Sequence, residues 1–175
     1  MIADPVTVRP ARPDEGPAVL AVLDDAAAWL AARGVAQWPA AFRPEYVEPS
    51  LGSGRMWLAE SGDAAVATFA LEWTDPLWVD AAGEDDGSAG YLHRFAVRRG
   101  HAGIGGTLLD WIDGEIRRHG RDRMRLDCDA ANTRLRAYYA DAGFEHRGDV
   151  LIPLEHVRWS SGQPLVSRYE RPVVR

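Results

Sequence analysis

Three side chains in the second half of the chain can move protons, and they are His93, Asp127 and Tyr139. A histidine changes its charge near neutral pH and needs little tuning to act as a base. A carboxylate such as that of Asp127 becomes a useful base where desolvation raises its pKa. A tyrosine hydroxyl, with an ordinary pKa of about 10, can donate a proton to a departing anion. These residue types are suited to general acid–base chemistry.

A glycine-rich turn, Val97–Thr107, lies between a predicted strand and a predicted helix. The free N–H groups and the dipole at a helix N-terminus attract anions, and glycine lets the backbone approach phosphate oxygens. The mononucleotide loop is excluded, because Gly106 stands at its lysine position and the chain has no lysine. The dinucleotide fingerprint fails as well, because Leu108 stands where its third glycine belongs. A pyrophosphate loop of a third kind remains, with a merely flexible turn as the alternative.

Composition limits the class of protein further. The 175 residues fit one domain, 1–175, and the net charge of −6 argues against a nucleic-acid partner. A single cysteine, Cys128, permits neither an intramolecular disulfide nor a cysteine-based zinc cluster, so no metal is expected. The sequence shows no signal peptide and no apolar run long enough for a membrane span, which predicts a cytoplasmic protein without a membrane partner.

The pattern of apolar residues and breakers predicts alternating strands and helices. A first helix is expected to begin at the N-cap Asp14, to bury Leu20, Leu23, Ala27 and Leu30, and to end at Gly34. Strands are predicted at 6–9, 56–60, 64–73, 91–97, 123–128, 144–152 and 165–171, and two further helices at 104–119 and 132–142. This order predicts an α/β fold with one mixed sheet and helices on both faces.

The segment from Asn132 to Phe144 adds a second motif. Tyr139 follows Asn132 by seven residues, and Gly143-Phe144 come eleven and twelve residues after it. Together with the glycine turn about thirty residues upstream, this pattern resembles the GNAT superfamily of N-acetyltransferases over residues 90–148. The resemblance implies the GNAT fold, with a single, mostly antiparallel mixed sheet, and acetyl-CoA as the co-substrate.

By this resemblance, the backbone of Phe95, Ala96 and Val97 would bind the pantetheine arm of acetyl-CoA. The pyrophosphate would be cradled by the amides of His101, Ala102, Gly103, Ile104, Gly105 and Gly106. Asn132 would meet the pantetheine or the loop from the other side. The chain departs from the family pattern in having Gly100 where a glutamine or arginine is usual, so Arg98 and Arg99 are candidates to supply charge to the phosphates.

The resemblance also assigns the catalytic roles. Tyr139 would protonate the departing thiolate, while its neighbour Tyr138 is interpreted as the packing tyrosine. His93 shares a strand face with Phe95 and Val97 if the side chains alternate, and it is a candidate base with Asp127 as its rival. Cys128 is a poor nucleophile because its strand neighbours are acidic, which favours direct transfer without an acetyl-enzyme.

The acceptor would meet the first helix, the next loop and the hairpins, where Trp38 and Trp78 are candidate substrate residues. The loop Asp75–Gly90 carries five acids and no base, which favours a cationic acceptor if these acids line the entrance. The predicted function is therefore acetyl transfer to a small or cationic primary amine. A non-catalytic acyl-CoA-binding or sensor domain of the same fold is the alternative, and a homodimer is left open.

Overall fold

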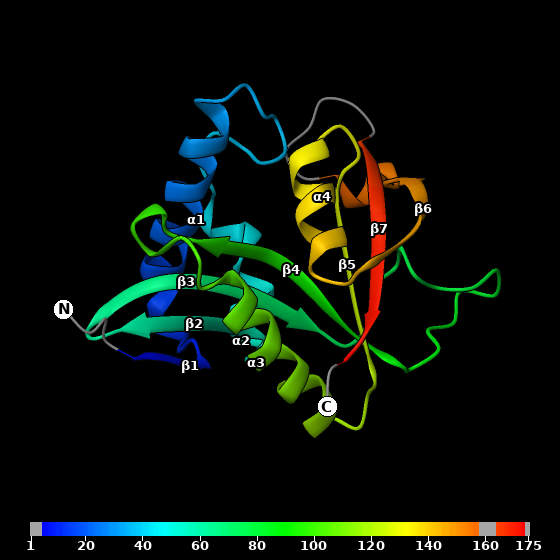
Figure 1. The fold of residues 1–175 in the computed structure, drawn as a ribbon, viewed down its shortest axis with the longest axis horizontal. Helices are drawn as coiled ribbons and strands as arrows, with labels where there is room; N and C mark the ends of the chain where they lie inside the picture. The colour runs from blue at the N-terminus through cyan, green and yellow to red at the C-terminus, as the bar shows by residue number, and fades with distance from the viewer. Residues whose placement is uncertain (1–4, 158–163, 174–175) are drawn as a thin grey trace. The chain divides into compact units, whose positions relative to one another are not determined.

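A computed structural model describes residues 5–157 and 164–173 of the chain (Figure 1). Seven strands form one mixed sheet in the order β1-β2-β3-β4-β5-β7-β6, and helices flank it. The strands are β1 (Val6–Pro10), β2 (Met56–Ser61), β3 (Ala64–Glu72), β4 (Ala89–Val97), β5 (Arg123–Asp129), β6 (Glu145–Leu151) and β7 (Leu165–Pro172). The α-helices are α1 (Gly16–Ala31), α2 (Glu48–Gly52), α3 (Gly105–Arg118) and α4 (Thr133–Asp141). The predicted α/β fold is confirmed, and each predicted strand and long helix is present within a few residues of its expected bounds.

The pairing of the strands is mixed, as the resemblance implied. Strands β4 and β5 run parallel, whereas β1–β2, β2–β3, β5–β7 and β6–β7 are antiparallel. The chain divides into two compact units, Met1–Leu71 with His93–Ile104 and Glu72–Leu92 with Gly105–Arg175. Strand β4 passes from one unit to the other between Leu92 and His93. That the two units form one domain remains a prediction.

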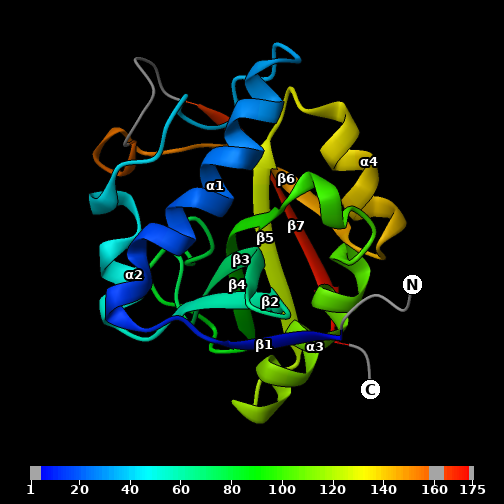
Figure 2. The same ribbon diagram turned by 90° about the vertical axis from the view of Figure 1, so that its left-hand side faces the viewer.

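The first unit packs α1 and α2 against its strands (Figure 2). The buried face of α1 consists of Val19, Val22, Leu23 and Ala27, and it meets core residues of β2 and β3. The prediction that Asp14 caps this helix was wrong. Residues Pro13–Glu15 form a 3₁₀ turn instead, because the Glu15 carboxylate accepts hydrogen bonds from Arg9 and from the backbone N–H of Arg12.

The second unit packs α3 and α4 onto β5, β6 and β7. The apolar side of α3 is buried through Leu108, Leu109, Ile112 and Ile116. On the same helix Asp113 is buried and pairs with Arg171 of β7 at 2.8 Å. Arg171 also donates to the carbonyl of Ala142 at the end of α4, so one guanidinium joins both helices to the sheet.

No helix in the described part of the chain is both long and apolar enough to cross a membrane. This finding does not test the cytoplasmic location, which remains a prediction.

We expect Asp113→Ala to lower the free energy of unfolding by about 3–5 kcal/mol, because it leaves the Arg171 guanidinium buried without its carboxylate. The matched control is Gly114→Ala, one residue along α3. A Cβ at Gly114 meets only the flexible ends of two arginines, at 3.6 and 4.0 Å, so this variant should gain about 0.5–1 kcal/mol. Urea titrations of both variants measure the two changes. A loss below 1 kcal/mol for Asp113→Ala would contradict the assigned role of the pair.

Candidate active site

The parallel pairing of β4 with β5 is short. It runs from Ala89 opposite Arg123 to Leu92 opposite Leu126, so the next residues of the two strands are His93 and Asp127. Two residues beyond Leu92, Arg94 adopts a left-handed conformation with φ of 51°. A non-glycine residue with this conformation interrupts the alternation of a strand. The alternation assumed between His93 and Phe95 is therefore interrupted at Arg94, and His93 follows directly where the pairing with β5 ends.

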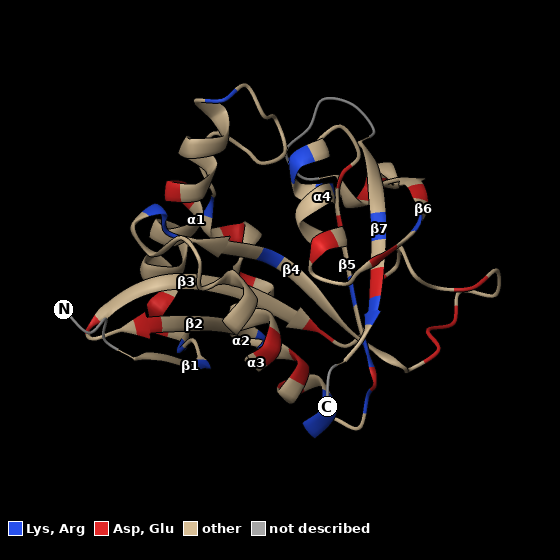
Figure 3. Cartoon of the chain, viewed as in Figure 1, with Lys and Arg blue, Asp and Glu red and all other residues tan. Residues whose placement is uncertain are grey.

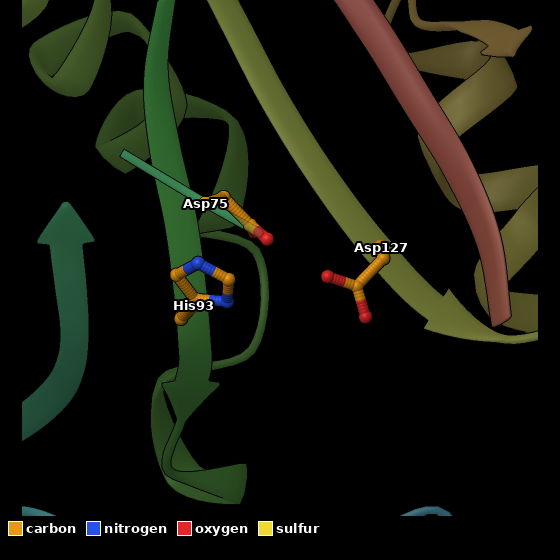
Figure 4. Close-up of side chains that lie close together, drawn as sticks. All are labelled: Asp75, His93 and Asp127. Carbon is orange, nitrogen blue, oxygen red and sulfur yellow. The ribbon is translucent and has the colours of Figure 1, made fainter. Parts of the chain in front are cut away.

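A third side chain joins this pair. Ligand atoms of His93, Asp127 and Asp75 all lie within 4.8 Å of one another, and Figure 4 shows the three side chains pointing toward a common point. Asp75 comes from the loop after β3, and it is the most buried of the three, at 3% exposed. The two candidate bases, His93 and Asp127, therefore lie close together, and which of them acts remains a prediction.

Sequence reasoning did not assign Asp75 a role in the site. It identified Asp75 only as one of the five acids of the loop, because nothing in the sequence indicates that this side chain is buried. One imidazole and two carboxylates are also a donor set that suits a divalent cation. The expectation of no metal therefore remains a prediction with a specific test.

Three of the other acids of this loop, red in Figure 3, have contacts within the second unit. Asp80 accepts from the backbone N–H groups of Ala82 and Glu84, which closes a turn. Asp85 accepts a hydrogen bond from the Tyr91 hydroxyl. Asp86 forms an ion pair with Arg125 at 2.7 Å, and this guanidinium lowers the pKa of the Asp86 carboxyl. The contacts of these three acids hold the loop in place.

The glycine turn has the expected position between β4 and α3. Its first part is a 3₁₀ turn over Arg99–His101, in which the N–H groups of His101 and Ala102 donate to nearby carbonyls. The N–H of Ile104 also donates locally, to the carbonyl of His101 at 3.4 Å. The predicted six-amide cradle was therefore too wide, because a tight turn uses three of its N–H groups.

The remaining glycines fit a phosphate group. Gly103 has φ of 107°, which glycine adopts at low cost, while Gly105 and Gly106 open α3 and have no acceptor for their N–H groups within the helix. A Cβ built on Gly103 or Gly106 would meet nothing within 4 Å. This open backbone is the arrangement that a pyrophosphate requires.

The two arginines of the turn differ in their surroundings. Arg99 lies over the Trp29 ring, with its guanidinium carbon 4.2 Å from the ring centroid, so it is engaged by α1. The Arg98 Nε is buried and has no hydrogen-bond partner among the described residues. Arg98 is therefore the better candidate to supply charge to a phosphate.

The remaining predicted cofactor residues lie on β4 and at the start of α4. Phe95 contacts Phe69 edge to face, and Ala96 is buried in the core of the first unit; Val97 is partly buried. Asn132 is the N-cap of α4, and its side-chain oxygen accepts from the N–H of Leu135 at 3.1 Å. The structure explains a capping role for Asn132, and its cofactor role remains a prediction.

The two adjacent tyrosines of α4 have the opposite exposure to the one expected. Tyr139 is 6% exposed and packs against Tyr138, Phe144 and Tyr169. Burial raises the pKa of Tyr139, which keeps its hydroxyl protonated. Tyr138 is 39% exposed, so the interpretation of Tyr138 as the packing residue was wrong. Successive helical residues point about 100° apart, and the sequence could not show which one faces the sheet.

Cys128 lies on β5 and is buried. Burial, and then the nearby Asp127 carboxylate, raise the pKa of its thiol to about 12. The prediction of a poor nucleophile agrees with this shift, with burial rather than the acidic neighbours as the larger cause.

The two candidate substrate residues lie in different units. Trp38 contacts Phe42 edge to face and packs against the core of the first unit. In the second unit, the Trp78 ring lies 5.0 and 5.1 Å from the guanidinium carbons of Arg125 and Arg168. Each tryptophan thus has a packing role, and contact with an acceptor remains a prediction.

Comparison with known proteins assigns the family. Residues 23–144 match the model of the Acetyltransferase (GNAT) family. The chain belongs to this family. It is also 31% identical over 157 residues to YesJ of Bacillus subtilis strain 168, described as an uncharacterized N-acetyltransferase, covering 84% of this chain and 86% of YesJ. The chain is therefore an acyltransferase enzyme, which sets aside the non-catalytic alternative.

Solved structures share the fold. A GNAT-family acetyltransferase from Listeria monocytogenes 4b F2365 superposes with a TM-score of 0.71 at 24% identity, covering 98% of each chain. The acetyltransferase yncA from Salmonella typhimurium, solved with acetyl-CoA, has a TM-score of 0.66 at 14% identity, covering 98% of this chain and 96% of that one. These similarities support the GNAT fold.

We expect Cys128 to resist thiol reagents in the folded protein. With a thiol pKa of about 12, its thiolate fraction at pH 8 is on the order of 10³-fold below that of a free cysteine. Absorbance after addition of an aromatic disulfide should show no fast release from the native chain and one equivalent after unfolding in guanidinium. Rapid stoichiometric release from the native chain would contradict the assigned burial.

Proposed function

We propose that this protein transfers the acetyl group of acetyl-CoA directly to a small, cationic primary amine. The observation that carries the proposal is the backbone of the glycine turn and of the start of α3, in a chain of the GNAT family: Gly103 and Gly106 have open space, and the N–H groups of Gly105 and Gly106 have no acceptor within the helix. The yncA structure was solved with acetyl-CoA, which supports the choice of co-substrate.

The residues for the co-substrate follow the family pattern. Gly103, Gly105 and Gly106 would offer backbone N–H groups to the pyrophosphate, and Arg98 would add a positive charge. The backbone of Phe95–Val97 and the side chain of Asn132 would hold the pantetheine arm. When bound, acetyl-CoA supplies an activated acyl group.

Proton transfer is assigned to this chain's own side chains. His93 would take the proton that the acceptor ammonium must lose, and the nearby carboxylates of Asp75 and Asp127 would stabilise the resulting imidazolium. The N–H of Val97 would stabilise the negative charge that develops on the acyl oxygen. Tyr139 would give its proton to the departing sulfur.

The same cluster supports a cationic acceptor. Two carboxylates beside one imidazole attract an ammonium group and repel an acidic substrate. Asp80, Asp85 and Asp86 do not support this choice, because each has a role in the loop itself. Trp38 and Trp78 remain candidates to contact the acceptor, and a homodimer remains a prediction.

The co-substrate site is tested by titrating CoA into two glycine variants in a calorimeter. Gly106→Val should weaken binding by about tenfold or more, because the side chain fills the space beside the free N–H groups of α3. Gly100→Val is the matched control, because it lies in the same loop and also has open space, but outside the proposed cradle. Equal affinity of wild type and a folded Gly106→Val variant would overturn the cofactor assignment.

The base is tested by the pH dependence of kcat/KM, measured as CoA release with a panel of small amines. In the wild type log kcat/KM should rise with pH through one inflection, and His93→Ala should abolish that inflection. Asp75→Asn should move it to lower pH, because a neighbouring carboxylate favours the protonated imidazole.

The same assay with and without a chelator distinguishes a base from a metal site. The rate should be unchanged after EDTA treatment and dialysis, if the His93 cluster works through proton transfer alone. A loss that zinc or another divalent cation restores would show that the cluster holds a metal. An identical pH profile in His93→Ala would move the role of base to another group.

A further inference from the structure

Tyr138 contacts the start of α3. A Cβ built on Gly105 would lie 2.5 Å from the hydroxyl oxygen of Tyr138 and 3.6 Å from the ring carbon that carries it. Carbon atoms do not approach an oxygen this closely without a shift. The Tyr138 hydroxyl therefore occupies the space that any larger residue at position 105 would need.

This contact offers a specific explanation for glycine at position 105. Its φ is not in the left-handed region, so backbone conformation does not demand glycine there, whereas Gly103 does have that conformation. At Gly106, one residue along, a Cβ would meet nothing within 4 Å. Among the glycines of the turn, Gly105 is the one whose Cβ would collide with another residue of the described chain.

The hydroxyl is available as a hydrogen-bond donor. It has no hydrogen-bond partner among the residues that the structure describes, and Tyr138 as a whole is 39% exposed. Partial burial raises the pKa of Tyr138, with Arg171 acting in the opposite direction, so the hydroxyl is protonated near neutral pH. A protonated hydroxyl beside the free N–H groups of a helix start extends the set of donors for an anion.

We propose that Tyr138 is a cofactor-binding residue whose hydroxyl donates a hydrogen bond to the pyrophosphate of acetyl-CoA, and that Gly105 is glycine in order to leave room for it. The inference rests on the proposed function, because it concerns the same co-substrate. It assigns the two adjacent tyrosines to different parts of that molecule: Tyr138 to the phosphates and Tyr139 to the sulfur.

The first experiment measures CoA affinity by calorimetry in three variants. Tyr138→Phe should weaken binding by about tenfold, the loss of one charge-assisted hydrogen bond. Gly105→Ala should weaken it similarly, because the new methyl group displaces the hydroxyl. The double variant should bind no worse than either single variant, because the ring carbon at 3.6 Å makes only an ordinary contact with the methyl group.

The second experiment compares two acyl donors, acetyl-CoA and acetyl-pantetheine, which lacks the pyrophosphate. For Tyr138→Phe the loss in kcat/KM should appear with acetyl-CoA and disappear with acetyl-pantetheine. For Tyr139→Phe the rate should fall by roughly 10²-fold with both donors, because the sulfur is common to them. Melting temperatures of all variants check that each chain is folded.

The outcomes separate the two proposals. If wild type binds CoA and Tyr138→Phe binds it equally well, or loses the same factor with both donors, the role of Tyr138 is overturned and the co-substrate assignment stands. If the double variant loses CoA affinity by the product of the two single losses, the proposed link between Gly105 and Tyr138 is likewise overturned. If wild type binds no CoA, the proposed function fails, and this inference fails with it.

Discussion

Four residue pairs join β4 to β5 in parallel, from Ala89–Arg123 to Leu92–Leu126, and the candidate site begins where this pairing ends. The next residue of β4 after the last pair is His93, and the next residue of β5 is Asp127. In parallel strands these two positions are adjacent. Within β4, Arg94 then takes a left-handed conformation, which interrupts the regular alternation of side chains. The cluster of His93, Asp127 and Asp75 lies just past the end of this short ladder.

Arginine provides many of the long-range polar contacts of the second unit. Arg125 is largely buried and binds Glu170, Asp86 and the Tyr91 hydroxyl, which ties the acidic loop to β4, β5 and β7. A guanidinium can hold several oxygens at once because its five donors are spread over a plane. The absence of lysine is consistent with this use, since an ammonium could not bridge the same partners. The acidic loop is thereby fixed through Asp85 and Asp86, while Asp75 at its start lies beside His93.

Much of the fold followed from local patterns in the sequence. Alternation, helical spacing and breakers placed the strands, and the glycine turn and the Asn132–Phe144 motif identified the family, because each signal lies within one short segment. The same signals predicted the starts of α3 and α4 within a residue of where the structure has them. They failed at Asp14. The N-cap of α1 is Glu15, whose carboxylate accepts a hydrogen bond from Arg9 of β1.

The sequence by itself therefore determined the family, the order of elements and the residue types available for chemistry. Tertiary structure alone decided which of the two adjacent tyrosines is buried. Either residue could face the sheet from a helix, and it is Tyr139 whose ring packs against Phe144 and Tyr169. It also decided which member of the acidic loop joins His93, and that the Tyr138 hydroxyl lies over Gly105. Apart from Tyr139–Phe144, these contacts join residues distant in the chain, so their geometry depends on how helices and strands pack and not on the spacing within any one segment.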